Sequence, residues 1–352
     1  MSAINRNSEF WLQELNVWQQ IETRHSCEFK RLATFEKGAD RVEFSANEIG
    51  ESHLGHLVRN EALQIAALDV LEKQWSEHVD VLYGAQIDAL EQHSSYSTLT
   101  LSFSLELTES KQDITTISAD LIIGADGARS RIRQLANIGS TGWDYQQACL
   151  SVTVKSQFPR QDITWQEFQP SGPKAFLPMN DGFACLIWYD AKDVVADLSK
   201  LSNQALKDQI LKTYSQLPGD FEIVRKASFP LRRNQANQYF KNRVVLVGDA
   251  AHTINPLAGQ GVNLGFKDNQ RLLTELAKIN DWSNSSDLTN ALLAYEKMQK
   301  LESKVMSAAM DSFYHLFSND KSLLKLARHA LLFATNKLTT IKKSVMKKAL
   351  GF

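Results

Sequence analysis

The sequence has 352 residues, 43% of them hydrophobic, which is enough to bury the cores of two or three globular domains. Its 39 basic and 40 acidic residues nearly cancel, so the overall charge argues against nucleic acid as the main partner. Three scattered cysteines argue against a secreted disulfide framework, and no apolar run is long enough to predict a membrane-spanning helix. We therefore expect a cytoplasmic protein with reduced thiols.

Two helices and several strands are predicted in the first part of the chain. The helices have apolar residues at helical spacing over residues 10–18 and from about 57 to 75. Residues 97–107 alternate between apolar and polar, which predicts a strand with one buried face. Residues 120–126 form a short apolar stretch that ends in Gly and Asp, typical of a strand buried on both faces of a parallel sheet.

The pattern changes at about residue 147, where long strands begin. Strands are predicted at 148–155, 164–169 and 183–190, with one helix from about 203 to 217, which indicates a domain built on an antiparallel sheet. Residues 243–248 return to the buried-strand type, and helices follow from about 261. We therefore predict a mixed α/β protein in which a first domain (1–146 and 236–285) is interrupted by a sheet domain (147–235) and followed by a helical region (286–352).

Residues 248–265 carry the clearest chemical signal, because a buried strand is followed by an acid, a glycine-rich loop and a helix. Asp249 at the end of the strand can accept hydrogen bonds from a polyol, and Gly259 and Gly261 let backbone amides approach a ligand closely. The positive end of the helix that begins near Gly261 favours negative charge by about 0.3–1 kcal/mol. A bare Gly-x-Gly would fit a loop without a ligand equally well, but the full eighteen-residue block favours a cofactor site.

A second motif, Gly-x-Asp-Gly-x-x-Ser-x-x-Arg at residues 124–133, precedes the first by about 120 residues. Alone, its Asp-Gly step fits plain turn chemistry. Its position after a parallel-sheet strand, and its order relative to the first motif, favour a joint cofactor site. A third segment, Asn60-x-x-Leu63-Gln64, fits either a cofactor contact or an ordinary amphipathic helix.

Together these segments resemble the para-hydroxybenzoate-hydroxylase-like flavin monooxygenases. The resemblance implies a Rossmann-like FAD/NAD(P)-binding domain in which Asp249 holds the ribityl chain of FAD and Pro256 lies beside the substrate face of the flavin. His252 fits a loop-ordering role better than that of a general base. The expected cofactor-binding residues are Asn60, Asp126, Gly127, Arg133, Gly248, Asp249, Gly259, Gln260, Gly261, Val262 and Asn263.

Shorter segments resemble the ubiquinone-biosynthesis branch of this family. They are residues 2–4, 15–18, 175–178, 188–190, 311–314, 317–319 and 348–351. The resemblance implies a monooxygenase that uses FAD, molecular oxygen and a reduced nicotinamide or other electron donor to hydroxylate a polyprenylated methoxy-methyl-benzoquinol. Two alternatives stay open: a catalytically impaired quinone-binding or assembly subunit, and a hydroxylase of a small soluble phenol. The oligomeric state is not predicted.

Complete members of the family open with a strand, a Gly-x-Gly-x-x-Gly turn and a helix, and this unit takes at least about 30 residues. The sequence begins after the position of that unit. Each charge-assisted hydrogen bond that the unit would supply is worth about 1.5–3 kcal/mol. We therefore expect an N-terminally truncated cofactor domain that binds FAD poorly or not at all, unless the chain starts further upstream or another chain supplies the unit.

Residues 318–352 contain eight lysines and arginines but only one acidic residue, Asp320, and leucines are interleaved with the basic residues. This pattern predicts basic amphipathic helix, which fits either a solvated surface helix or a contact with the inner face of the cytoplasmic membrane or a biosynthetic complex. No metal site is expected, because His53-x-x-His56 has no further ligands that the sequence places nearby.

Overall fold

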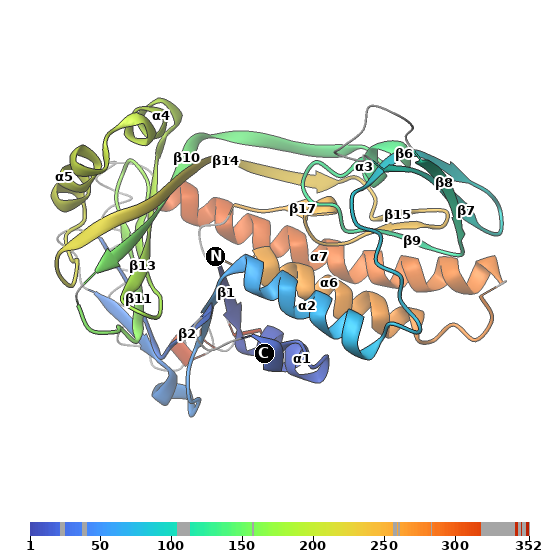
Figure 1. Ribbon diagram of the computed structural model, residues 1–352, viewed down its shortest axis with the longest axis horizontal. Coiled ribbons are helices and arrows are strands. Elements are labelled where there is room, and N and C mark those ends of the chain that lie inside the picture. Colours follow the sequence, from blue (N-terminus) through green and yellow to red (C-terminus); the bar gives the residue numbers. More distant parts are fainter. Residues whose placement is uncertain are drawn as a thin grey trace.

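The computed structural model describes residues 1–21, 25–36, 41–103, 113–156, 158–255, 259, 261–282, 284–317, 342–343, 346 and 350–351. A large sheet lies at one end of the molecule and a group of smaller sheets lies at the other (Figure 1). Two long strands and one long helix run between the two ends. The three cysteines are buried free thiols.

A small antiparallel sheet with two helices forms the N-terminal part. Its elements are β1 (Ser2–Asn5), α1 (Arg6–Glu14), a 3-10 turn (Trp18–Gln20), β2 (Ser26–Phe29), β5 (Gly55–Val58) and α2 (Asn60–Gln74), with β5 between β1 and β2. The Asn5 side chain caps α1 by accepting a hydrogen bond from the Ser8 amide. A helix is present at the first predicted position, but it ends at Glu14, before Val17 and Trp18. The second begins at Asn60 because the residues before it pair in the sheet.

An eight-stranded sheet forms the largest core of the protein. In spatial order its strands are β17 (His252–Thr253), β14 (Phe221–Ala236), β10 (Ser140–Ser156), β13 (Phe183–Ala191), β12 (Lys174–Pro178), β11 (Ile163–Phe168), β3 (Arg31–Glu36) and β4 (Val42–Ser45). All neighbours are antiparallel except β11 and β3. The predicted antiparallel character is confirmed, and the sheet also takes in two strands from residues 31–45.

Two helices cover one side of this sheet. They are α4 (Lys192–Lys200) and α5 (Asn203–Thr213). Leu206 and Ile210 on α5 are fully buried and pack into the same apolar cluster as Leu150, Phe176 and Leu186 of the strands. The helix at 203–213 was predicted, whereas α4 was not. The other side of the sheet faces α7 and the loop that follows β16 (Figure 1).

Short strands at the other end include the two that were predicted from their apolar composition. β16 (Val244–Leu246) lies between the parallel strand β9 (Ile122–Gly124) and the antiparallel strand β15 (Phe240–Lys241), and α3 (Arg131–Leu135) follows β9. We predicted that β9 is buried on both faces. Within the described residues this prediction is wrong, since Ile123 is 48% exposed. A separate antiparallel sheet lies beside the pair; its strands are β6 (Ala85–Gln92), β7 (Ser97–Phe103) and β8 (Asp113–Ala119).

Two helices complete the described chain: α6 (Gly261–Leu276) and α7 (Ser285–Phe317). Ion pairs from Lys267 and Arg271 on α6 to Glu302 on α7 join them. Within the described residues no helix is long and apolar enough to cross a membrane.

Most of the predicted basic helix after residue 318 lies outside the described residues. Three later residues pack against the body of the protein. Lys342 pairs with Glu48 at 2.8 Å, and Met346 and Leu350 are buried against residues of β2 and β5. The end of the chain is therefore anchored to the N-terminal sheet.

Candidate cofactor site

The acid of the first motif lies where the buried strand β16 ends. Val244 to Leu246 are completely buried, and Gly248 then turns the chain with a φ of +58°, which a residue without Cβ adopts without strain. The neighbouring Asp249 remains exposed, yet the surrounding protein desolvates its carboxylate enough to raise the pKa. Within the described residues this carboxylate accepts no hydrogen bond, so its oxygens are available to a ligand.

The N-terminal end of α6 lies next to this turn. The Cα atom of Gly248 is 3.4 Å from the Cβ that Gly265 would carry, so two glycines allow the turn and the helix to approach closely. Among the described residues, a Cβ at Gly261 would meet nothing within 4 Å, so there is room beside the first helical residue. The first amides of a helix have no intrahelical acceptor and carry the positive end of the helix dipole. The sequence motif therefore places an acid and a helix N-terminus side by side.

His252 and Asp268 hold the turn and the helix together. His252 Nε2 is 2.7 Å from Asp268 Oδ2, and the same oxygen accepts a hydrogen bond from the Gly248 amide at 2.6 Å. Both side chains are almost fully buried. This supports loop ordering as the role of His252, which remains a prediction. Asp268 was missed by the sequence analysis, although its position between Leu264 and Leu272 on the buried stripe of α6 signals an acid with a partner.

Asn263 connects the site to β1. Its side chain donates to the Ala3 carbonyl at 2.8 Å and accepts from the Asn5 amide at 3.0 Å. Gly259, with a φ of +63°, passes so close to Ala3 that a Cβ would lie 3.3 Å from that side chain. At the other end of the strand, the Ser2 hydroxyl donates to Asn60. The structure thus brings Asn60 and the Gly259 to Asn263 segment to the same strand, with Val262 packed beneath.

The second motif contacts the first through Arg133. This buried guanidinium donates to the Ala250 carbonyl at 2.7 Å and to the Ala128 carbonyl at 3.0 Å. Asp126 Oδ2 accepts from the amides of Arg131 and Ile132, so it caps α3, and Gly127 turns the chain with a φ of +79°. Arg133 therefore joins the two predicted motifs, while Asp126 orders the start of α3 within its own motif.

A polar and aromatic cluster lies between the large sheet and α7, beside the loop after His252. The Tyr145 hydroxyl donates to Asp311 at 2.5 Å, and Arg233 pairs with the same carboxylate. Burial raises the pKa of Tyr145, and Asn255 lies next to it with only 2% of its surface exposed. The sequence analysis missed these residues. Pro256 and Gln260 lie outside the described residues.

A buried apolar cluster packs around these residues. It is formed by Cys149, Tyr189 and Leu231 from the sheet and Met310 from α7, with Ile187 and Met306 partly buried beside them. These contacts join the large sheet to α7.

Comparisons with known proteins show what the chain as a whole is similar to. A family model for an FAD binding domain matches residues 47–300. The 3-demethoxyubiquinol 3-hydroxylase of Escherichia coli is 35% identical over 351 residues, which are 100% of this chain and 87% of that protein. The mitochondrial ubiquinone biosynthesis monooxygenase COQ6 of Xenopus tropicalis is 28% identical, over 98% of this chain and 81% of that protein. The crystal structure of p-nitrophenol 4-monooxygenase from Pseudomonas putida superimposes with a TM-score of 0.80 at 15% identity, over 99% of this chain and 87% of that one.

Proposed function

Because the chain belongs to the FAD-dependent monooxygenases that hydroxylate aromatic rings, we propose that it hydroxylates a prenylated methoxy-methyl-benzoquinol in ubiquinone biosynthesis. The family is the one that the sequence motifs resemble. The observation that carries the proposal is the position of the Asp249 carboxylate, which accepts no hydrogen bond from the described residues, on a turn packed against the first turns of α6. The relatives that match over nearly the whole chain are hydroxylases of ubiquinone biosynthesis by name.

The residues at this site fit FAD. The Asp249 carboxylate can accept hydrogen bonds from a ribityl hydroxyl, because the described protein supplies no donor to it. A Cβ at Gly261 would meet no described atom within 4 Å, so the backbone there has room to contact a planar ring. Asn60, on the other side of β1, can reach the same ligand. We assign these residues to the cofactor, and Pro256 and Gln260 to the same loop.

Bound FAD would supply the activation of molecular oxygen, because protein side chains cannot carry out this redox chemistry. The N-terminal end of α6 would stabilise negative charge in front of Gly261. The apolar residues around Leu231 and Met310 would hold the quinol ring and exclude water from it. Asp268 and His252 would keep the turn and the helix end in place. We propose molecular oxygen as the co-substrate and a reduced nicotinamide or another donor as the source of electrons.

The substrate proposal is tested by incubating the purified chain with FAD, an electron donor and either a short-chain prenylated demethoxyquinol or a small soluble phenol. We expect a product heavier by one oxygen from the prenylated quinol, because the apolar cluster and the named relatives favour an apolar ring. Mass spectrometry detects the product. Turnover of the phenol alone would instead support a soluble substrate, and quinol binding without turnover would support an assembly subunit.

The basic segment after residue 318 is proposed to contact anionic membrane or a protein of the biosynthetic complex, where a prenylated substrate is supplied. Replacing Lys321, Lys325 and Arg328 by glutamine is expected to weaken binding to vesicles that contain anionic lipid. Surface attraction of this kind is worth about 1 kcal/mol per charge, so three changes should lower the partition coefficient by about a hundredfold.

Co-sedimentation with vesicles measures this effect. Lys342 is left unchanged because it pairs with Glu48, and the last residues are retained because Met346 and Leu350 are buried. A matched variant carries Lys192→Gln and Lys212→Gln on the helices of the large sheet. Equal partitioning of all three proteins would show that the segment is only a solvated surface helix.

A further inference from the structure

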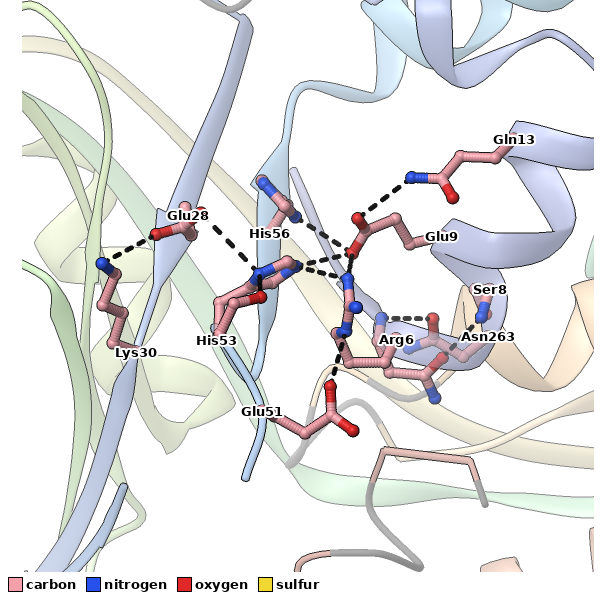
Figure 2. Close-up of polar contacts among 12 residues, drawn as sticks. Arg6, Ser8, Glu9, Gln13, Glu28, Lys30, Glu51, His53, His56 and Asn263 are labelled. Carbon is pink, nitrogen blue, oxygen red and sulfur yellow. Dashed lines mark hydrogen bonds and ion pairs between the residues drawn. The ribbon is translucent and has the colours of Figure 1, made fainter. Parts of the chain in front are cut away.

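A cluster of two histidines and a glutamate lies outside the cofactor site. Glu9 comes from α1, His56 from β5, and His53 from the loop just before that strand. One ligand atom from each lies within 4.8 Å of the other two, and the side chains are 4%, 8% and 13% exposed for Glu9, His53 and His56. Figure 2 shows all three directed at one point, together with Arg6.

The hydrogen bonds of this cluster cannot all be satisfied at once. His53 Nε2 is 2.8 Å from Glu9 Oε2, which can only accept, and also 2.8 Å from a nitrogen of Arg6, which can only donate. Whether or not Nε2 carries a proton, one of these two contacts is unfavourable. His56 Nδ1 is buried, lies 3.4 Å from the same glutamate oxygen and makes no hydrogen bond in the described structure. A buried group without a hydrogen-bond partner costs free energy.

A metal ion resolves this conflict, because it takes lone pairs from all three groups simultaneously. In a tetrahedral zinc site the ligand atoms lie about 3.3–3.5 Å apart. The 3.4 Å between His56 Nδ1 and Glu9 Oε2 already fits, and the 2.8 Å between His53 Nε2 and Glu9 Oε2 needs to open by about half an ångström. The two histidine nitrogens lie within 4.8 Å of each other and need to adjust to the same spacing. Two imidazoles and a carboxylate are a ligand set that suits zinc.

The surroundings support His53 as a ligand. The Ser52 hydroxyl lies 2.8 Å from His53 Nδ1, and Glu28 on the neighbouring strand lies 3.7 Å from the same nitrogen. A proton on Nδ1 that is donated to the Ser52 oxygen would leave the Nε2 lone pair for a metal ion. The rings are also held in place, since His53 packs edge-on against His56 and Trp18 packs against His56 from another side.

The Arg6 guanidinium lies where a metal ion bound to these three side chains would lie. Its guanidinium contacts Glu9 at 2.9 Å and His53 at 2.8 Å, while its Nε lies 3.4 Å from Glu51. A divalent ion would displace the guanidinium toward Glu51, because two cations cannot share the position. Arg6 and a metal therefore compete for the same carboxylate.

We propose that Glu9, His53 and His56 form a zinc site, with Arg6 as the internal cation that occupies it when no metal is bound. The ion would join α1 to β5. It would act next to β1, whose Ala3 and Asn5 hold Asn263 of the cofactor site. The proposed role is to clamp the N-terminal helix, and three protein ligands leave a fourth position for water.

The test is equilibrium dialysis of the full chain against zinc, with the visible spectrum of the cobalt-substituted protein as a second readout. We expect one ion per chain, a tetrahedral cobalt spectrum, and a melting temperature that rises with zinc concentration. Glu9→Gln and His56→Ala should each lower the affinity by at least about a hundredfold, since loss of a ligand exceeds the 10–100-fold typical of an outer partner. His78→Ala, at an exposed histidine, is the matched control with unchanged affinity.

Arg6→Gln is expected to raise the affinity for zinc, and a variant that merely misfolds cannot do this. Circular dichroism of each variant without metal shows whether it is folded. The proposal is overturned by a wild-type chain that takes up no zinc or cobalt, by binding that survives both Glu9→Gln and His56→Ala, or by an Arg6→Gln affinity that does not rise.

Discussion

Replacing Asp268 with alanine is expected to destabilise the protein by about 3–6 kcal/mol, because two hydrogen bonds to a carboxylate are lost and each is worth about 1.5–3 kcal/mol. Asp268 is completely buried, and one of its oxygens is hydrogen-bonded to both the His252 ring and the Gly248 amide. Its loss leaves a buried amide and a buried imidazole without their acceptor. Chemical denaturation followed by circular dichroism measures the free energy of unfolding.

The control for this prediction is Asp69→Ala, because Asp69 forms an ion pair with Lys73 on the surface of α2 and should change stability by no more than about 0.5 kcal/mol. The double variant His252→Ala with Asp268→Ala measures the interaction free energy between the two side chains. It should be less destabilised than the sum of the two single changes, since each removes the same contact. A strictly additive double variant, or an Asp268 effect as small as that of Asp69, would show that the pair does not hold the turn.

Replacing Asp249 with alanine is expected to weaken FAD binding by about tenfold to a hundredfold. A hydrogen bond to a charged group contributes about 1.5–3 kcal/mol, and each 1.4 kcal/mol corresponds to a factor of ten in the dissociation constant. Because the described protein makes no hydrogen bond to this carboxylate, the change should not unfold the chain. Titration with FAD, followed by flavin fluorescence, compares the dissociation constants of the two proteins.

Asp249→Asn is the matched variant, since asparagine keeps one acceptor oxygen and should lose less affinity than alanine. Asp69→Ala serves again as the surface control. Equal dissociation constants for the wild type and both Asp249 variants would remove Asp249 from the cofactor site.

The pH dependence follows from the raised pKa of Asp249, which results mainly from burial. A carboxyl whose pKa is higher in the folded chain than in the unfolded chain stabilises the fold fully below its ordinary pKa. That contribution is lost as the pH rises through the raised value. FAD hydroxyls prefer the ionised form, so FAD affinity should fall as the pH is lowered through the pKa of the free protein. Asp249→Asn should lack both effects.

Much of the cofactor part could be predicted from the sequence because its determinants are local. A buried strand, an acid, a glycine with positive φ and a helix start follow one another within residues 243–265, and the structure reproduces that order. Both β9 and β16 were predicted as strands of a parallel sheet from their apolar composition, and the structure pairs them in parallel.

The contacts that depend on distant residues could not be predicted in this way. β3 pairs with β11 across more than a hundred residues, and no local pattern of the short strand at residues 31–36 specifies its partner. Asp268 becomes a partner of His252 only when α6 packs on the turn. In the same way, His53 and His56 gain Glu9 as a neighbour only when α1 folds over β5.

A structure determined with FAD bound tests the central claim most directly, namely that the end of β16 and the start of α6 form the flavin site. We expect the ribityl hydroxyls within hydrogen-bond distance of the Asp249 carboxylate and the flavin ring beside the backbone from Gly259 to Asn263. FAD bound elsewhere on the protein, with this space filled by the chain's own side chains, would contradict the account.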